Sequence, residues 1–280
     1  MAGLADTVEL PSGVRLQYVE QGDPSGVPVV LLHGFADSWH SFELVLPHLP
    51  RSIHAFAPTL RGHGDSSRPA TGYGIPDLEA DLEAFMDALH IESALIVGHS
   101  MGSAVALRYA IDHHERVLGL VLTGASAGTR GGEAARKFWD AILESLTDPV
   151  DAGLVRRMSE SMLAQPVPPA FLETLVRESL KVPAYVWRAT FESRWHGEGD
   201  YSAEIGRIEA GTLIIWGDQD SRYPRTEQEA LAAAIPGSQL VVYAGAGHGP
   251  HWEEPERFAS DLATFVEKLR HGAHPSGQRQ

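Results

Sequence analysis

The chain has 280 residues, no cysteine and a formal net charge of −15 at pH 7. A chain of this length holds one large α/β domain with an insertion, or two small domains. The acidic balance argues against nucleic acid or an anionic membrane as the main partner. The absence of cysteine excludes disulfides, thiolate metal sites and cysteine nucleophiles.

The N-terminal segment, residues 1–9, carries neither a basic region nor an apolar run, so no signal peptide is expected. No run of about 18 apolar residues is present, so no membrane span is expected either. We therefore expect a soluble, cytoplasmic protein that acts on a small-molecule substrate. The composition leaves the oligomeric state open.

Strand-like and helix-like segments alternate in the first half of the chain. Short continuous apolar runs predict buried strands, and apolar residues at helical spacing predict helices. In chain order we expect a hairpin at 6–20, a strand at 28–32, a short amphipathic helix at 38–48, a strand at 53–57, a helix opened by Pro76, a strand at 93–97, a further helix and a strand at 117–123. This order implies right-handed crossovers and a mostly parallel sheet.

The segment at 93–107 predicts a strand, a sharp turn and a helix around the sequence Gly-His-Ser-Met-Gly at 98–102. A serine hydroxyl is a weak nucleophile, so it has to stand on a strained strand-to-helix turn where a base can reach it. Glycines two residues before and after Ser100 relieve the crowding of that turn. The helix that follows would aim its first N–H groups, above all that of Met101, at charge developing beside Ser100.

The same Gly-x-Ser-x-Gly pattern occurs again at 124–128, around Ser126. This second copy also follows a strand-like run, but a glycine-rich stretch that is typical of a loop comes after it. We therefore interpret Ser126 as a loop serine at a domain junction and Ser100 as the nucleophile.

Between about residues 128 and 206 the alternation stops, and helical patterns rich in large apolar residues replace it. A helical core explains most of these residues, while Trp and Met also suit the wall of an apolar pocket. We take Trp139 and Trp187 from this segment as candidate substrate-binding residues. The strand pattern then resumes with a strand at 212–216, a helix at 225–234, a strand at 239–243 and a terminal helix from Pro255.

Four predicted strand ends carry groups that are useful in catalysis: His33-Gly34-Phe35, Ser100, Asp218 with Asp220, and His248. In such sheets, catalytic groups gather at the carboxyl ends of the strands. The chain order Ser, Asp, His is the order of an α/β-hydrolase triad. On these residues the sequence resembles the α/β-hydrolase superfamily over nearly all of residues 6–270, as a capped, esterase- or lactonase-like member with a serine nucleophile.

The resemblance implies an α/β-hydrolase fold, with a mostly parallel central sheet flanked by helices and a helical cap inserted after the sixth strand. It assigns residues 1–128 and 207–270 to the core and residues 129–206 to the cap. Residues 271–280 are left as a polar tail that we expect to be disordered.

The resemblance also assigns roles to single residues. Ser100 matches the nucleophile, His248 the general base and Asp220 the acid that orients the imidazole. The backbone N–H groups of Phe35 and Met101 would form the oxyanion hole. Such a donor is typically worth ~10²–10³ in turnover.

Two of these assignments have rivals. Asp218 follows the same strand as Asp220, but the family's Gly-x-x-Asp spacing selects Asp220. His251 lies close to His248, but the Glu and Pro that follow His248 at the family's spacing favour His248.

Other features of the chain bear on the site less directly. His33 resembles the loop histidine of the family, which holds the loop by hydrogen bonds, and Thr59 stands where relatives commonly have Asp. Neither an HExxH nor an HxH pattern occurs, so we expect no metal site, and the resemblance implies no cofactor.

A serine nucleophile implies an acyl-enzyme route, although the segment at 33–39 also resembles enzymes with a carboxylate nucleophile. We predict a hydrolase that cleaves a carboxylic ester or lactone of a small to medium, largely apolar substrate. A carbon–carbon bond hydrolase of the meta-cleavage type is an alternative, because Trp252 (a third candidate substrate-binding residue) and a cap arginine, Arg188 or Arg194, resemble that group. A cofactor-free perhydrolase or haloperoxidase-like enzyme and, outside the enzymes, a ligand receptor on the same fold also stay open.

Overall fold

Eight strands form one mixed sheet in the order β1-β2-β4-β3-β5-β6-β7-β8 in the computed structural model, which describes residues 5–126, 133–195 and 200–272. The strands are β1 (Asp6–Glu9), β2 (Arg15–Gln21), β3 (Val27–Leu32), β4 (Ile53–Pro58), β5 (Ala94–His99), β6 (Val117–Thr123), β7 (Thr212–Gly217) and β8 (Gln239–Tyr243). β2 pairs antiparallel with β1 and β4, and the pairs from β4 through β3 to β8 are parallel. The predicted mostly parallel sheet is thereby confirmed.

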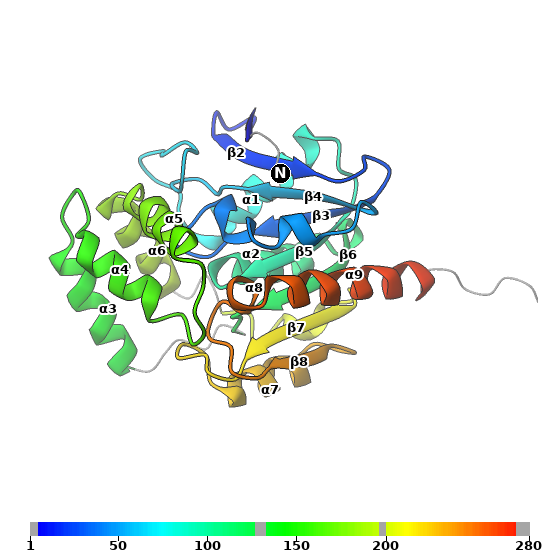
Figure 1. Cartoon of the computed structure of the whole chain (residues 1–280). Helices are drawn as coiled ribbons and strands as arrows, with labels where there is room; N and C mark the ends of the chain where they lie inside the picture. Colours follow the sequence, from blue (N-terminus) through cyan, green and yellow to red (C-terminus); the bar gives the residue numbers. More distant parts are fainter. Residues whose placement is uncertain (1–4, 127–132, 196–199, 273–280) are drawn as a thin grey trace, which may run out of the picture.

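The helices lie around this sheet and at one end of it (Figure 1). They are α1 (Ile75–Ala88), α2 (Met101–Asp112), α3 (Glu133–Ser145), α4 (Ala152–Glu160), α5 (Pro169–Leu180), α6 (Ala184–Trp195), α7 (Arg225–Ala234), α8 (Pro250–Glu253) and α9 (Pro255–Gly272). Helices α3 to α6 follow β6 and precede β7, so the predicted helical insertion after the sixth strand is confirmed.

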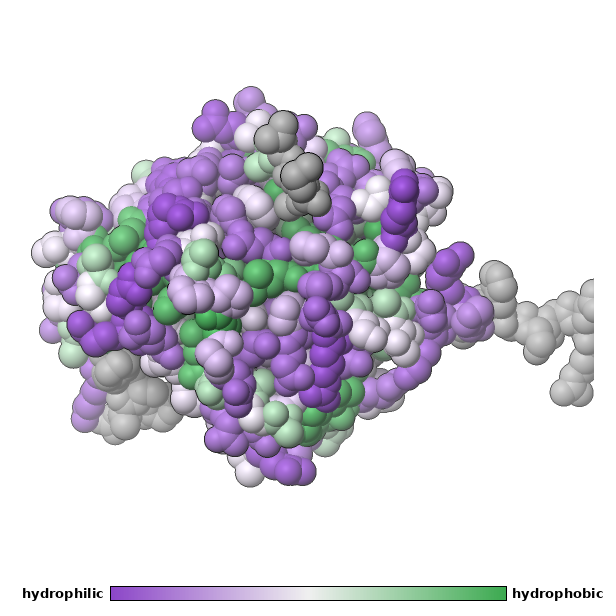
Figure 2. Space-filling model, viewed as in Figure 1, coloured by the Kyte–Doolittle hydropathy of each residue, from purple (hydrophilic) through white to green (hydrophobic). Residues whose placement is uncertain are grey.

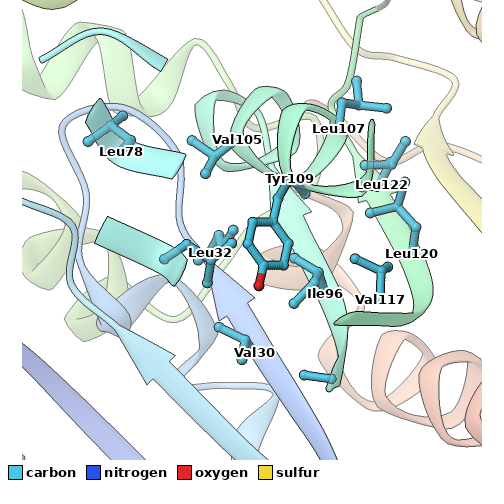
Figure 3. Packing of buried hydrophobic residues seen from close by; sticks show 14 of the residues in the cluster. Val30, Leu32, Leu78, Ile96, Val105, Leu107, Tyr109, Val117, Leu120 and Leu122 are labelled. Atoms are coloured by element: carbon cyan, nitrogen blue, oxygen red, sulfur yellow. The ribbon is translucent and has the colours of Figure 1, made fainter. Parts of the chain in front are cut away.

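The sheet is covered on both faces. Neighbouring residues of each central strand point to opposite faces, so each strand contributes side chains to both layers. Val30 and Leu32 of β3 pack in a cluster with α1 and α2, as Figure 3 shows around Val105 and Tyr109. Val29 and Leu31 pack in a second cluster together with residues of α9. Burial of each such large aliphatic side chain contributes roughly 1.5–3 kcal/mol, so both layers fix the strand ends in place.

The predicted helix at 38–48 is wrong. The segment instead forms two short 3₁₀ helices, η1 (Trp39–Phe42) and η2 (Leu46–His48). Pro47 has no N–H, so it cannot donate the hydrogen bond that a continuous α-helix over 38–48 would require at this residue. Ser38 caps η1 through the N–H of His40, so the segment starts as predicted but stops early.

The terminal helix α9 extends to Gly272, two residues into the segment predicted as a tail. Residues 273–280 lie outside the described residues. Two further 3₁₀ helices, η3 (His114–Arg116) and η4 (Ile205–Arg207), precede β6 and β7.

The insertion has a core of its own, formed by residues of α3, α4, α5 and α6 around Trp187. Several contacts join it to the sheet domain. Among them, Phe35 packs into this core, and Trp252 packs with Phe171 and Leu175 of α5. On the face shown in Figure 2, hydrophilic residues predominate and hydrophobic residues form small patches. Among the described residues, none of the helices combines the length and apolar character required to cross a membrane.

Candidate active site

Ser100 lies on a strained turn between β5 and α2, with φ +51° and ψ −110°. An L-residue adopts this region rarely, so the surroundings must hold it there. A Cβ on Gly102 would lie 2.2 Å from the carbonyl oxygen of Leu32, and one on Gly98 would lie 2.5 Å from that of Gly102. The two flanking positions therefore require glycine, as the sequence pattern predicts.

Asp220 and His248 form a buried pair at the ends of β7 and β8. His248 Nδ1 lies 3.0 Å from Asp220 Oδ2, and the two side chains are 3% and 1% exposed. The other carboxylate oxygen, Oδ1, accepts hydrogen bonds from the backbone N–H groups of Arg222 and Tyr223. The backbone N–H of His248 donates to Met162 in the insertion at 2.9 Å. The His248 imidazole is thus oriented by a carboxylate that is itself held in place.

The two rival residues have other partners. Asp218 Oδ1 accepts from the N–H of Gly245 at 2.7 Å in an exposed loop. His251 Nε2 lies 3.1 Å from Ser41 Oγ, and burial lowers its pKa well below the ordinary value. The geometry therefore pairs Asp220 with His248, as the sequence spacing predicts.

Ser100 and His248 line a common cavity of about 360 Å³, a size suited to a small ligand. Apart from Asp220, the other predicted site residues also lie on its wall: Phe35, Met101, Trp139, Trp187 and Trp252. Aromatic rings pack against one another there, with Phe35 and Trp187 edge to face at 4.8 Å and Trp139 stacked on Phe191 at 4.3 Å. Most of this wall is apolar, and both the sheet domain and the insertion contribute to it.

The backbone N–H groups of Phe35 and Met101 have no hydrogen-bond acceptor among the described residues. His33 holds the loop that carries Phe35. Its Nε2 accepts from the N–H of Leu60 at 2.9 Å, and its Nδ1 donates to the carbonyl of Gly34 at 2.7 Å. Burial lowers the pKa of His33 to about 3, so the ring is neutral and can fill both roles. Two free donors are thus available beside Ser100.

Several cavity residues were not predicted from the sequence. Asp37, Ser221 and Arg222 all line the cavity. Ser126, predicted to be a loop serine at a domain junction, lies on the cavity wall as well. Residues 127 and 128 of its motif lie outside the described residues. Arg222 could have been predicted from the sequence, because it belongs to the loop at the carboxyl end of β7, where catalytic groups gather.

One of the two arginines expected for a carbon–carbon hydrolase, Arg188, is engaged elsewhere. The Arg188 guanidinium donates to the backbone carbonyls of Leu143 and Leu146, at 3.2 and 2.6 Å, and it ties α6 to α3. The side chain of Arg194 lies outside the described residues.

Thr59 is buried, and its hydroxyl accepts from the N–H of Trp39 at 3.1 Å. Among the residues that the structure describes, no group of His, Asp and Glu is arranged to hold a metal ion.

A known protein family matches most of the chain. Residues 27–255 match the model of a family described as the alpha/beta hydrolase fold. The chain belongs to this family. Such a match covers both ends of the site, from the strand before the Phe35 loop to the helix after His248.

Relatives within the alpha/beta hydrolases include more than one chemistry. The chain is 32% identical to a 2-hydroxymuconate semialdehyde hydrolase from Pseudomonas sp. (strain CF600), over 92% of each chain. An esterase from Exiguobacterium antarcticum superposes with a TM-score of 0.84 at 26% identity, covering 94% of this chain and all of that one. An esterase from Rhodococcus sp. ECU1013 has a TM-score of 0.81 at 27% identity, covering 95% and 99%. This alpha/beta hydrolase is thus similar to esterases and to a hydrolase of another kind.

Proposed function

We propose that this alpha/beta hydrolase is a serine hydrolase that cleaves a carboxylic ester or a lactone of a small to medium, largely apolar substrate. The observation that carries the proposal is that Ser100 lines one cavity with His248, whose imidazole is paired with Asp220, and that the cavity wall is mostly apolar. The esterases that share its fold at 26–27% identity support this choice.

In the proposed reaction His248 takes the proton of Ser100 while the serine oxygen attacks the ester carbonyl. Asp220 holds the imidazole in the tautomer with the proton on Nδ1 and stabilises the imidazolium. The tetrahedral oxyanion binds to the N–H groups of Phe35 and Met101, which have no other acceptor among the described residues. His248 then gives its proton to the leaving alcohol.

The second half of the reaction regenerates the serine. His248 takes a proton from water, which attacks the acyl carbon and forms the oxyanion again. Collapse of this intermediate releases the acid and returns the proton to Ser100. Under the same proposal the insertion acts as a cap: Trp139 and Trp187 line the cavity, and their apolar rings limit the access of bulk water to the acyl-enzyme.

A fluorophosphonate probe tests the assignment of the nucleophile. We expect one covalent adduct, located on Ser100 by peptide mass, and we expect its rate of formation to fall sharply in His248→Ala. Ser126→Ala is the matched control, because Ser126 lines the same cavity and follows the same five-residue pattern; it should label like the wild type. An adduct on Ser126, or esterase activity that survives in Ser100→Ala, would contradict the proposal.

Carbon–carbon bond hydrolysis is a second candidate, favoured by the 32% identity to the 2-hydroxymuconate semialdehyde hydrolase. Of the two arginines that pointed to it, Arg188 is engaged with backbone carbonyls, which counts against a role for Arg188 in binding the substrate. A panel of esters, lactones and dienones compared by kcat/KM decides between the two, with the ester proposal requiring that an ester or lactone is the best substrate.

A further inference from the structure

Arg222 brings a positive charge to the wall of the active-site cavity. It follows Asp220 by two residues, in the loop between β7 and α7, and lines the same cavity as Ser100. Its backbone N–H donates to Asp220 Oδ1 at 2.7 Å. The Arg222 backbone is therefore held by the same carboxylate that orients His248.

The guanidinium group of Arg222 has few partners in the protein. Its Nη2 donates to Ser161 Oγ, at the C-terminal end of α4, at 2.8 Å. Among the described residues, Nε and Nη1 have no acceptor and no carboxylate forms an ion pair with the guanidinium. An arginine side chain offers five N–H donors in a planar fork, so most of its binding capacity is unused.

A partly buried cation without an ion pair is unfavourable unless something compensates for its lost hydration. Burial lowers the pKa of Arg222, while Asp220 acts in the opposite direction through space. The guanidinium nevertheless stays charged, because an arginine side chain is not deprotonated in proteins. A carboxylate bound in the cavity would provide the missing counter-charge in a geometry that matches the guanidinium fork.

The other charged groups that line the cavity also favour the binding of an anion at Arg222. Asp200 and Glu227 also line the wall. Each carboxylate repels an anionic group that comes close to it, whereas Arg222 attracts one. The Ser161 hydroxyl, already bonded to Arg222, links this charge to the insertion.

We propose that Arg222 binds a carboxylate of the substrate, so that the preferred substrate is a half-ester of a dicarboxylic acid with an apolar chain between its two ends. The inference rests on the proposed function, since Ser100 attacks the ester end. Packed against the aromatic wall, the apolar chain of the acid would lead to the free carboxylate at Arg222. Arg222 is thus a specificity-determining residue of the same site.

The test compares the mono-para-nitrophenyl ester of adipic acid with para-nitrophenyl hexanoate, which has the same acyl chain length and no charge. We expect the wild type to prefer the half-ester in kcat/KM. The ratio of the two kcat/KM values should fall about 10- to 100-fold in Arg222→Gln, mainly through the KM of the half-ester, as the loss of a charge-assisted hydrogen bond implies. Arg222→Lys should keep part of the preference.

Arg225→Gln is the matched control, because Arg225 lies three residues further on and is paired with Glu229 at 2.8 Å on the exposed side of α7. It should leave the ratio unchanged. An equal loss of kcat/KM on both esters in Arg222→Gln would overturn the proposal, since it would mean that Arg222 only holds Asp220 or α4 in position. A wild type without preference for the half-ester would overturn it too.

Failure of the proposed function gives a different result, namely no turnover of either ester and no adduct on Ser100. Calorimetric titration with adipate then tests the anion site alone. Binding to the wild type that weakens about 10- to 100-fold in Arg222→Gln supports the site. Equal binding by both proteins, or no binding by the wild type, rejects it.

Discussion

Asp220 contacts His248 across 28 positions of sequence, with Oδ2 of the acid 3.0 Å from Nδ1 of the imidazole. The contact is possible because β7 and β8 are parallel neighbours, so that the loops following them lie at the same edge of the sheet. Two backbone N–H groups hold the other carboxylate oxygen. Since the acid is fixed on both oxygens, it can fix the imidazole in turn.

Asp220→Asn should therefore lower kcat by ~10³–10⁴, because the amide favours the wrong imidazole tautomer while it keeps the shape of the side chain. Esterase kinetics on a para-nitrophenyl ester measure the effect, and the thermal midpoint checks the fold. Asp218→Asn is the control: its side chain bonds the N–H of Gly245 in an exposed loop, so kcat should stay close to that of the wild type. A larger loss in Asp218→Asn than in Asp220→Asn would show that the acid had been misassigned.

The elbow and the strand ends could be predicted from the sequence because their determinants are local. Gly98 and Gly102 are required by backbone contacts within one turn, and apolar runs such as 28–32 report burial on both faces directly. The chain order of Ser100, Asp220 and His248 then fits one known arrangement of strand ends.

The composition of the cavity wall could not be read in the same way. Whether Asp37, Ser126 or Arg222 points into the cavity depends on how the insertion packs over the sheet, and the periodicity of a loop carries no such information. Arg188 shows the same limit. It lies in the segment where a substrate-binding arginine was expected, but its guanidinium donates to backbone carbonyls.

Gly102→Ala should disrupt the elbow, because the new Cβ would lie 2.2 Å from the carbonyl oxygen of Leu32, a backbone atom that cannot move aside cheaply. We expect a loss of several kcal/mol in the free energy of unfolding, of the kind seen for severe overpacking. Urea denaturation measures this loss. Gly206→Ala is the control, since its Cβ would meet its nearest atom at 3.8 Å. Equal stability of the two variants would contradict the strained geometry of the turn.

Arg61 and Asp81 form a buried ion pair, with Arg61 Nε donating to Asp81 Oδ2 at 2.5 Å and Nη2 donating to Oδ1. Asp81→Ala would leave the guanidinium without its counter-ion and should lower the free energy of unfolding by ~3–5 kcal/mol. In the exposed pair of Arg225 and Glu229, Glu229→Ala should change it by less than about 1 kcal/mol. Urea denaturation of both variants provides the comparison, and similar values would mean that burial does not govern the Arg61 pair.

Asp37 makes the stability of the fold depend on pH. Its side chain is buried beside the Phe35 loop, Oδ1 accepts from the N–H of Ser38 at 2.8 Å, and Oδ2 has no partner among the described residues. Burial raises the pKa of Asp37 from 3.8 to about 7, and the nearby carboxylate of Glu178 in α5 acts in the same direction. The folded protein therefore keeps a proton that the unfolded chain has already lost.

Between about pH 4 and 7 the unfolded chain releases the Asp37 proton and the folded protein does not, so stability should fall as pH rises through this window. Asp37→Asn has no proton to release. Its thermal midpoint should therefore fall less than that of the wild type between about pH 5 and about pH 7, which lies within that window. Glu256→Gln, at a side chain that is 82% exposed, should keep the wild-type slope. Parallel curves for the wild type and Asp37→Asn would mean that Asp37 is ionised throughout, and that the loop which carries Phe35 tolerates a buried charge.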